Sequence, residues 1–177
     1  AVLFDPAEPW EPWAPQAGWN GKIVWPFGPA AGTLHSQGLP GNVLDATRLG
    51  EGFMVATHSM NQHSTNLNTV VSAESVMMLQ EHITETYGEI RYVIGRGGSG
   101  ASIQQQTIAY RTGQVNDAQH LNLVPIIDLR PSENNGIHTN FHTWEMKERL
   151  SPTLPWLSYA DGPGGESLGE PPTSSPS

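Results

Sequence analysis

Residues 90–105 read IRYVIGRGGSGASIQQ, which is an apolar run, a glycine-rich turn and a helix-compatible segment in succession. The run at 90–94 predicts a short strand, and residues 101–110 predict a helix that begins directly after the turn. A strand, a tight glycine-rich turn and a helix in this order are typical of α/β domains that place their chemistry at the turn.

Further apolar and periodic segments lie on both sides of this stretch. Strands are predicted at 22–27, 53–57 and 124–129, and helices at 72–87, where Gly88 acts as the stop, and at 141–150. Strands that alternate with helices predict an α/β fold with a mostly parallel sheet and helices on both faces. The apolar runs also suit strands that are buried on both faces.

The ends of the chain differ in composition from its middle. Residues 1–20 are rich in Pro and Trp, which predicts an extended arm lying on a surface. Residues 161–177 consist largely of Gly, Pro, Ser and Glu, which predicts a disordered tail. One domain is therefore expected over residues 21–160.

Charge and cysteine content exclude several classes of function. The net charge is −9, with 8 basic and 17 acidic residues, so neither nucleic acid nor an anionic membrane is expected as a partner. No apolar run approaches the ~20 residues of a membrane span. Cysteine is absent, which excludes disulfides and thiol catalysis. The first residues lack the basic and apolar regions of a signal peptide and suit the mature end of an extracellular or periplasmic protein.

The turn fits the nucleophile elbow, whose pattern is small-x-Ser-x-small. Residues 97–101, GGSGA, place Ser99 at its centre. A serine in that strained position exposes its hydroxyl, and the residues two positions away must be small for steric reasons. Ser102 is a poor alternative nucleophile because Gln104 occupies its second small position.

An elbow serine also needs donors for the oxyanion that develops during acyl transfer. The N–H of Gly100, directly after the serine, is the first expected donor. The second should come from the loop at 28–32, which follows the predicted strand at 22–27. Pro29 has no N–H, so Gly28 or Ala30 would have to donate.

Two other interpretations of the turn remain open. The dinucleotide fingerprint G-x-G-x-x-G is met by Gly95, Gly97 and Gly100. It requires an acidic residue at the end of the next strand about 20 residues on, and Asp117 lies near that distance but in a loop-like segment. The other reading is a glycine-rich turn without chemistry.

A serine nucleophile needs a base, and the base needs an orienting acid. We take His138 as the best candidate base, and Asp128, near the end of a predicted strand, as the acid; Glu133 is the alternative acid. His138 and His142 are also spaced for a metal, with Glu145 or Glu133 as the third ligand, but the H-E-x-x-H glutamate is missing. No metal or cofactor is therefore predicted.

Other histidines are weaker candidates. His58 and His63 follow the strand predicted at 53–57, at the sheet edge where sites form. His82 lies on the polar side of the predicted 72–87 helix and is expected on the surface. His120 precedes a predicted strand and is expected to have a structural role.

Four segments together resemble a family of bacterial, mostly secreted proteins of unknown function that look like α/β-hydrolases related to tannases and feruloyl esterases. They are APQAGWNGKIVWPFG, GFMVATHSMN, VVSAESVMMLQEHITETYGEIRYVIGRGGSGASIQQQ and AYRTGQVNDAQHLNLVPIIDLRPSENNGIHTNFHTWEMKERL, and they cover roughly residues 14–150. The resemblance implies a reduced α/β-hydrolase sheet with Ser99 as nucleophile.

The chain departs from that family in several places. The family usually has Cys before the nucleophile, where this chain has Gly98, and its other cysteines are replaced around residues 30–31 and at Leu67. A lid-like segment of the family is missing between Gln106 and Ala109. The family often has an acid where this chain has Gly136, and no final strand is visible after residue 150.

The sequence therefore predicts a secreted serine ester hydrolase that acts on a small-molecule ester, neutral or aromatic. The alternative is a catalytically degenerate relative that binds a ligand or assembles with itself. An incomplete sheet would expose an edge strand, which predicts a homo-oligomer formed through that edge.

Overall fold

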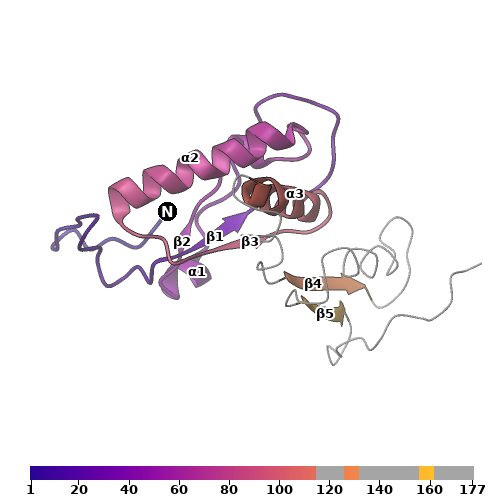
Figure 1. The fold of residues 1–177 in the computed structure, drawn as a ribbon. Helices are drawn as coiled ribbons and strands as arrows, with labels where there is room; N and C mark the ends of the chain where they lie inside the picture. Colours follow the sequence, from indigo (N-terminus) through magenta and orange to yellow (C-terminus); the bar gives the residue numbers. More distant parts are fainter. Residues whose placement is uncertain (115–125, 132–155, 162–177) are drawn as a thin grey trace, which may run out of the picture. The chain divides into compact units, whose positions relative to one another are not determined.

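A computed structural model describes residues 1–114, 126–131 and 156–161 (Figure 1). The chain divides into two compact units, Ala1–Thr112 and Gly113–Ser177. The predicted helix at 141–150 and the predicted tail beyond residue 161 lie outside the described residues. In the described part, no helix has the length and apolar character needed to cross a membrane.

A three-stranded parallel sheet forms the centre of the first unit. Its strands are β1 (Lys22–Pro26), β2 (Met54–Val55) and β3 (Tyr92–Arg96), in the order β2-β1-β3. Ile23 of β1 lies opposite Met54 on one side and Val93 on the other. The predicted α/β class and parallel sheet are confirmed, although β2 is shorter than the predicted strand and β3 begins two residues later.

The second unit contains two described strands, which pair in parallel. β4 (Ile126–Pro131) corresponds to the strand predicted at 124–129 and begins two residues later than predicted. It pairs with β5 (Trp156–Asp161). β5 is not predicted from the sequence, because the polar Ser158 interrupts its apolar residues and the segment is followed directly by residues typical of a disordered tail.

Helices follow each strand of the first unit: α1 (Ala46–Gly50) after β1, the short 3-10 helix η1 (Ser59–Asn61) and α2 (Thr69–Tyr87) after β2, and α3 (Gly100–Gln114) after β3. In the view of Figure 1, α2 and α3 lie above the strands and α1 below them. α2 begins three residues before the predicted helix, because the Asn68 side chain accepts hydrogen bonds from the N–H groups of Val70 and Val71. It ends at Gly88, as predicted, where φ is 121°.

The core lies around β1, whose Ile23 and Trp25 are fully buried. The Pro/Trp-rich arm, residues 1–20, packs against this core. Trp19 is itself a core residue, and the indole N–H of Trp10 donates to the carbonyl of Tyr87 at 2.8 Å. The arm contains turns and an antiparallel bridge between Glu11 and Ala14 rather than one extended stretch, and part of it is buried rather than lying on the surface.

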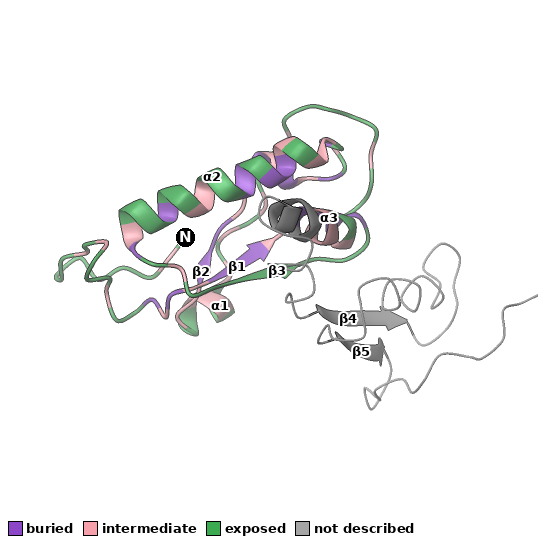
Figure 2. Ribbon diagram, in the orientation of Figure 1, coloured by how far each residue is buried: buried purple, intermediate pink, exposed green. Residues whose placement is uncertain are grey.

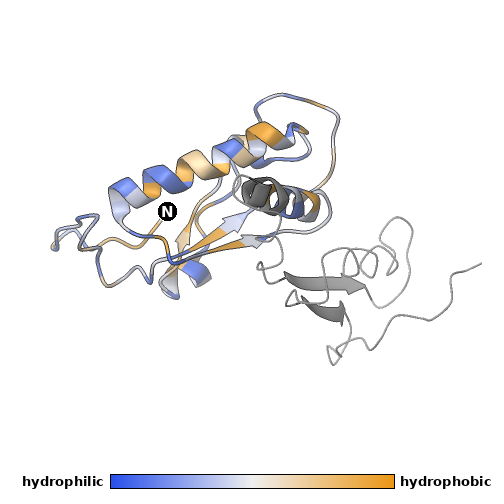
Figure 3. Cartoon of the chain, viewed as in Figure 1, coloured by the Kyte–Doolittle hydropathy of each residue, from blue (hydrophilic) through white to orange (hydrophobic). Residues whose placement is uncertain are grey.

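β3 departs from the expected burial. Tyr92 is 63% exposed, Val93 39% and Ile94 45%, so the prediction that the apolar runs are buried on both faces is wrong for this strand. Figure 2 shows β3 as exposed, and Figure 3 shows that much of it is hydrophobic. The physical reason is its position at the sheet edge: β3 pairs with β1, and no described strand pairs with its other side.

Candidate active site

Ser99 lies in a strained turn between β3 and α3. Its φ is +54°, and among the described residues the only other non-glycine with positive φ is Ala30, at +65°. A left-handed conformation costs a non-glycine residue roughly 1–2 kcal/mol, and such strain clusters at functional sites. The serine is exposed to solvent. Both the strain and the exposure are properties that the elbow pattern predicts for its central serine.

The positions two residues from Ser99 are closely packed. A Cβ atom added to Gly97, whose φ is +148°, would lie 2.5 Å from the Cβ of Ala101 and 3.0 Å from the carbonyl oxygen of Phe27. A Cβ on Gly98 would have no neighbour within 4 Å. The turn thus requires small residues on both sides of the serine, as the pattern predicts, and leaves room at Gly98.

Strand pairing brings the predicted oxyanion loop to the elbow. β1 and β3 are parallel neighbours with Pro26 opposite Arg96, so the loops that follow them emerge at the same end of the sheet. A Cβ atom added to Gly100 would overlap the carbonyl group of Ala30. The first residue of α3 and the 28–32 loop are therefore in backbone contact, and only glycine fits at position 100.

The amide groups at this contact are not equally available. The N–H of Gly28 donates to the carbonyl of Asn61 at 2.9 Å, and Pro29 has no N–H. The N–H of Ala30 makes no hydrogen bond to a described residue, and that of Gly100 is one of the unpaired donors at the start of α3. Of the predicted pair Gly28 and Ala30, Ala30 is the donor that remains free.

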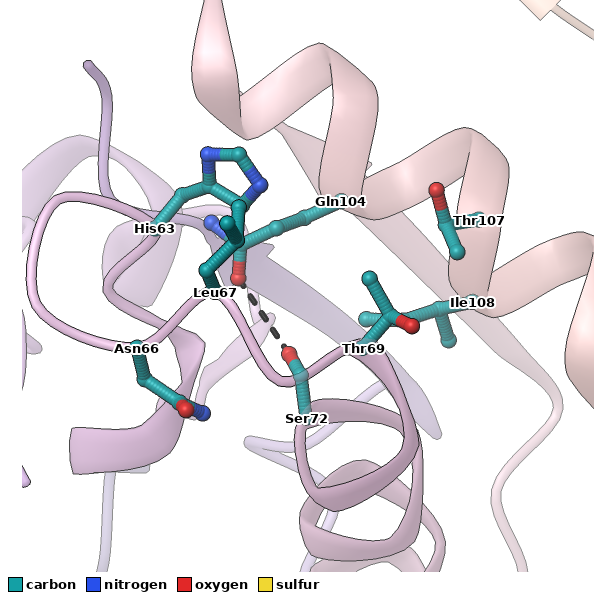
Figure 4. Close-up of a pocket in the computed structure, with 8 residues that line it drawn as sticks. All are labelled: His63, Asn66, Leu67, Thr69, Ser72, Gln104, Thr107 and Ile108. Atoms are coloured by element: carbon teal, nitrogen blue, oxygen red, sulfur yellow. Dashed lines mark hydrogen bonds between the residues drawn. The ribbon is translucent and has the colours of Figure 1, made fainter. Parts of the chain in front are cut away.

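A buried polar network supports the same loop. The side-chain amide of Gln104, only 1% exposed, donates to the carbonyl of Gly28 at 3.2 Å. Its oxygen accepts from the hydroxyl of Ser72 at 3.2 Å (Figure 4). The side-chain N–H of Asn61 also donates to the Ser72 hydroxyl, at 2.9 Å. The side-chain oxygen of Asn61 accepts a hydrogen bond from the indole N–H of Trp25 at 3.1 Å. The network joins the central strand and α2 to the oxyanion loop.

His63 is the described histidine that lies beside the elbow. It is 3% exposed, and its Nδ1 lies 3.3 Å from the carbonyl oxygen of Ala30. Its Nε2 is buried and has no hydrogen-bond partner among the described residues. The ring borders a pocket too narrow for a water molecule, whose lining includes Gln104 and Leu67 (Figure 4).

Two further described histidines, His58 and His82, have different roles. The ring of His58 caps η1 by accepting a hydrogen bond from the N–H of Met60 at 3.1 Å. His82 is exposed on α2, as predicted. The positions of His58 and His63 after a strand indicate a site edge, whereas no sequence prediction above gives a role to Gln104 or Asn61. The buried spacing of Ala101, Gln104 and Ile108 along one face of α3 is the signal that points to Gln104.

The predicted base and several alternatives lie outside the described residues: His138, His142, Glu133, Glu145, His120 and Asp117. The predicted acid Asp128 lies on β4, opposite Ser158 of β5. Over residues 1–114, 126–131 and 156–161, no group of three or more potential metal ligands occurs. The described part therefore brings Ser99, Gly100 and Ala30 together, while the base and the acid stay predictions from the sequence.

Comparison with known proteins gives one family. A family model described as a tannase-like family of unknown function matches residues 1–109 and 107–153. No curated protein and no solved structure matches the chain.

Proposed function

The chain belongs to the tannase-like family of unknown function, and from this membership and the strained turn at Ser99 we propose that it is a serine ester hydrolase. The observation that carries the proposal is the positive φ of Ser99, held between a strand and a helix and flanked by residues that must be small. An elbow of this form presents a serine hydroxyl to a substrate carbonyl. We also propose that the sheet is a reduced α/β-hydrolase sheet and that the protein acts outside the cytoplasm.

The proposed reaction has two steps. The Oγ of Ser99 attacks the ester carbonyl while its proton passes to His138, which Asp128 orients. The tetrahedral oxyanion accepts hydrogen bonds from the N–H groups of Gly100 and Ala30. The intermediate then expels the alcohol, which takes the proton from His138, and leaves an acyl group on Ser99. Water then attacks the acyl group while the same histidine takes its proton. The Oγ of Ser99 leaves and receives that proton from the histidine, which releases the acid and restores the serine.

The charge of the chain favours a neutral or aromatic ester as substrate. A net charge of −9 repels anionic polymers and gives no footprint for nucleic acid. A tannase-like family suggests esters of aromatic acids, and the proposal therefore takes small aromatic esters as the first class to test.

The hypothesis that the turn binds a dinucleotide has less support. The fingerprint glycines provide a tight turn, close approach of the pyrophosphate and helix packing. None of these functions calls for a left-handed non-glycine residue, whereas Ser99 has φ of +54°. Asp117, the acidic residue that this reading needs, lies outside the described residues.

Covalent labelling tests the nucleophile directly. We expect a fluorophosphonate probe to modify the wild-type protein once, on the peptide that contains Ser99, because the probe reacts with activated serines. The matched control is Ser102→Ala, three residues further on, whose hydroxyl donates to the carbonyl of Gly97 at 3.1 Å. Labelling should persist in Ser102→Ala and vanish in Ser99→Ala. A folded wild-type protein that takes up no label would point instead to a catalytically degenerate relative.

We also propose that a second copy of the chain pairs with the exposed edge of β3. Exposed strand edges present unpaired backbone groups and favour association, and Val93 and Ile94 add exposed apolar surface there. The molar mass measured by light scattering should rise with protein concentration for the wild type. For Val93→Lys it should stay at the mass of the monomer. Val70→Lys, at a similarly exposed valine on α2, is the control. A monomeric wild type at high concentration would refute the pairing.

A further inference from the structure

We propose that His63 is a positioning residue of the oxyanion hole, which holds Ala30 in the left-handed conformation that leaves its N–H free for the oxyanion. The inference rests on the proposed function, since an oxyanion hole has a role only if Ser99 attacks a carbonyl. It assigns a role to a buried histidine that the proposed reaction does not otherwise use.

His63 contacts the 28–32 loop at two points. Its ring contacts the carbonyl oxygen of Ala30 through Nδ1 at 3.3 Å, and its own carbonyl accepts from the N–H of Gly32 at 3.1 Å. The other end of the loop is also fixed, because both backbone polar groups of Gly28 are hydrogen-bonded. Residue 30 is thus anchored from both sides, and its N–H is left without a described partner.

Ala30 has a strained backbone conformation. A φ of +65° is unfavourable for alanine, so the surrounding structure must impose it. Ala30 is exposed and its side chain is a single methyl group, so burial of the side chain does not supply the constraint. The described contacts that supply it are the ring of His63 and the backbone of Gly100.

Stability of the fold does not explain why residue 63 is a histidine. A carbonyl oxygen only accepts, so the ring of His63 must donate to Ala30 from Nδ1, and this contact leaves Nε2 unused. That Nε2 is buried with no partner in the described part of the chain, and a buried polar atom without a partner costs stability. An apolar side chain of similar size would avoid this cost. A histidine therefore fits a requirement for a donor at Nδ1 better than a packing requirement.

The experiment compares His63→Leu with His63→Asn in the hydrolysis of p-nitrophenyl butyrate. Leucine fills the space but donates nothing, so we expect kcat to fall by about 10- to 100-fold with KM nearly unchanged, somewhat less than the loss on removing an oxyanion donor outright. The Nδ2 group of asparagine lies close to the position of Nδ1, so His63→Asn should recover most of kcat. His82→Leu, at an exposed histidine, is the control. Thermal unfolding should show that His63→Leu is at least as stable as the wild type.

The outcomes separate the two proposals. Full kcat in His63→Leu, beside a wild type whose activity depends on Ser99, would overturn the role of His63 and leave the hydrolase proposal standing. Equal losses of kcat in both variants, accompanied by lower unfolding temperatures, would show a structural role and also overturn it. A folded wild type with no activity that depends on Ser99 would overturn the hydrolase proposal, and the role of His63 with it.

Discussion

Replacing Ser99 by alanine is expected to lower kcat/KM for p-nitrophenyl butyrate by about 10⁴-fold or more, because removal of a serine nucleophile costs most of the catalytic effect. Nothing else should change, since the side chain is exposed and makes no hydrogen bond that the described structure contains. Circular dichroism should therefore give the same spectrum and nearly the same melting temperature for the variant and the wild type.

The control for this result is Ser102→Ala, which should keep wild-type kinetics. Equal activity in Ser99→Ala and the wild type would contradict the assignment of the nucleophile. Ser99→Gly adds an independent test of the strain, because glycine adopts positive φ readily. It should be as inactive as Ser99→Ala and about 1 kcal/mol more stable than that variant, since the left-handed penalty of ~1–2 kcal/mol is partly offset by the entropy of glycine.

Replacing Gly100 by valine is expected to produce the second largest effect, and the effect should be both structural and catalytic. The new Cβ would overlap the carbonyl of Ala30, which is backbone and cannot rotate away. The loop or the start of α3 must shift. We expect a loss of about 1–3 kcal/mol in the free energy of unfolding and a fall of about 10²- to 10³-fold in kcat as the two oxyanion donors separate.

The matched control is Gly98→Ala, two residues earlier, where the added Cβ meets no atom within 4 Å. Its free energy of unfolding should stay within about 0.5 kcal/mol of the wild-type value. Urea unfolding and ester hydrolysis measured on both variants test the prediction. Wild-type stability in Gly100→Val would show that the 28–32 loop does not contact the start of α3.

The turn could be predicted from the sequence because its constraint is local. The requirement for small residues at 97 and 101 follows from the conformation of one serine, and five residues suffice to show the pattern. The α2 helix was predictable for the same reason, with a stop signal at Gly88. The first residue of α2 was not predicted correctly, because the prediction took no account of Asn68 as the helix cap.

The supports of the site could not be predicted, because they join residues far apart in the chain. Gln104 reaches Gly28 across 76 positions, and His63 reaches Ala30 across 33. No periodicity or spacing encodes such pairs. The exposure of β3 was missed for a related reason: an apolar run indicates a strand, but only the strand order shows that it lies at an edge.

Trapping the acyl-enzyme tests the central claim most directly. The wild-type protein is mixed with p-nitrophenyl butyrate, quenched in acid during turnover, and analysed by intact-mass and peptide mass spectrometry. The account predicts one butyryl group per chain, carried on the peptide that contains Ser99 and absent from Ser99→Ala. Hydrolysis without an adduct, or an adduct that persists in Ser99→Ala, would contradict acyl transfer through this serine.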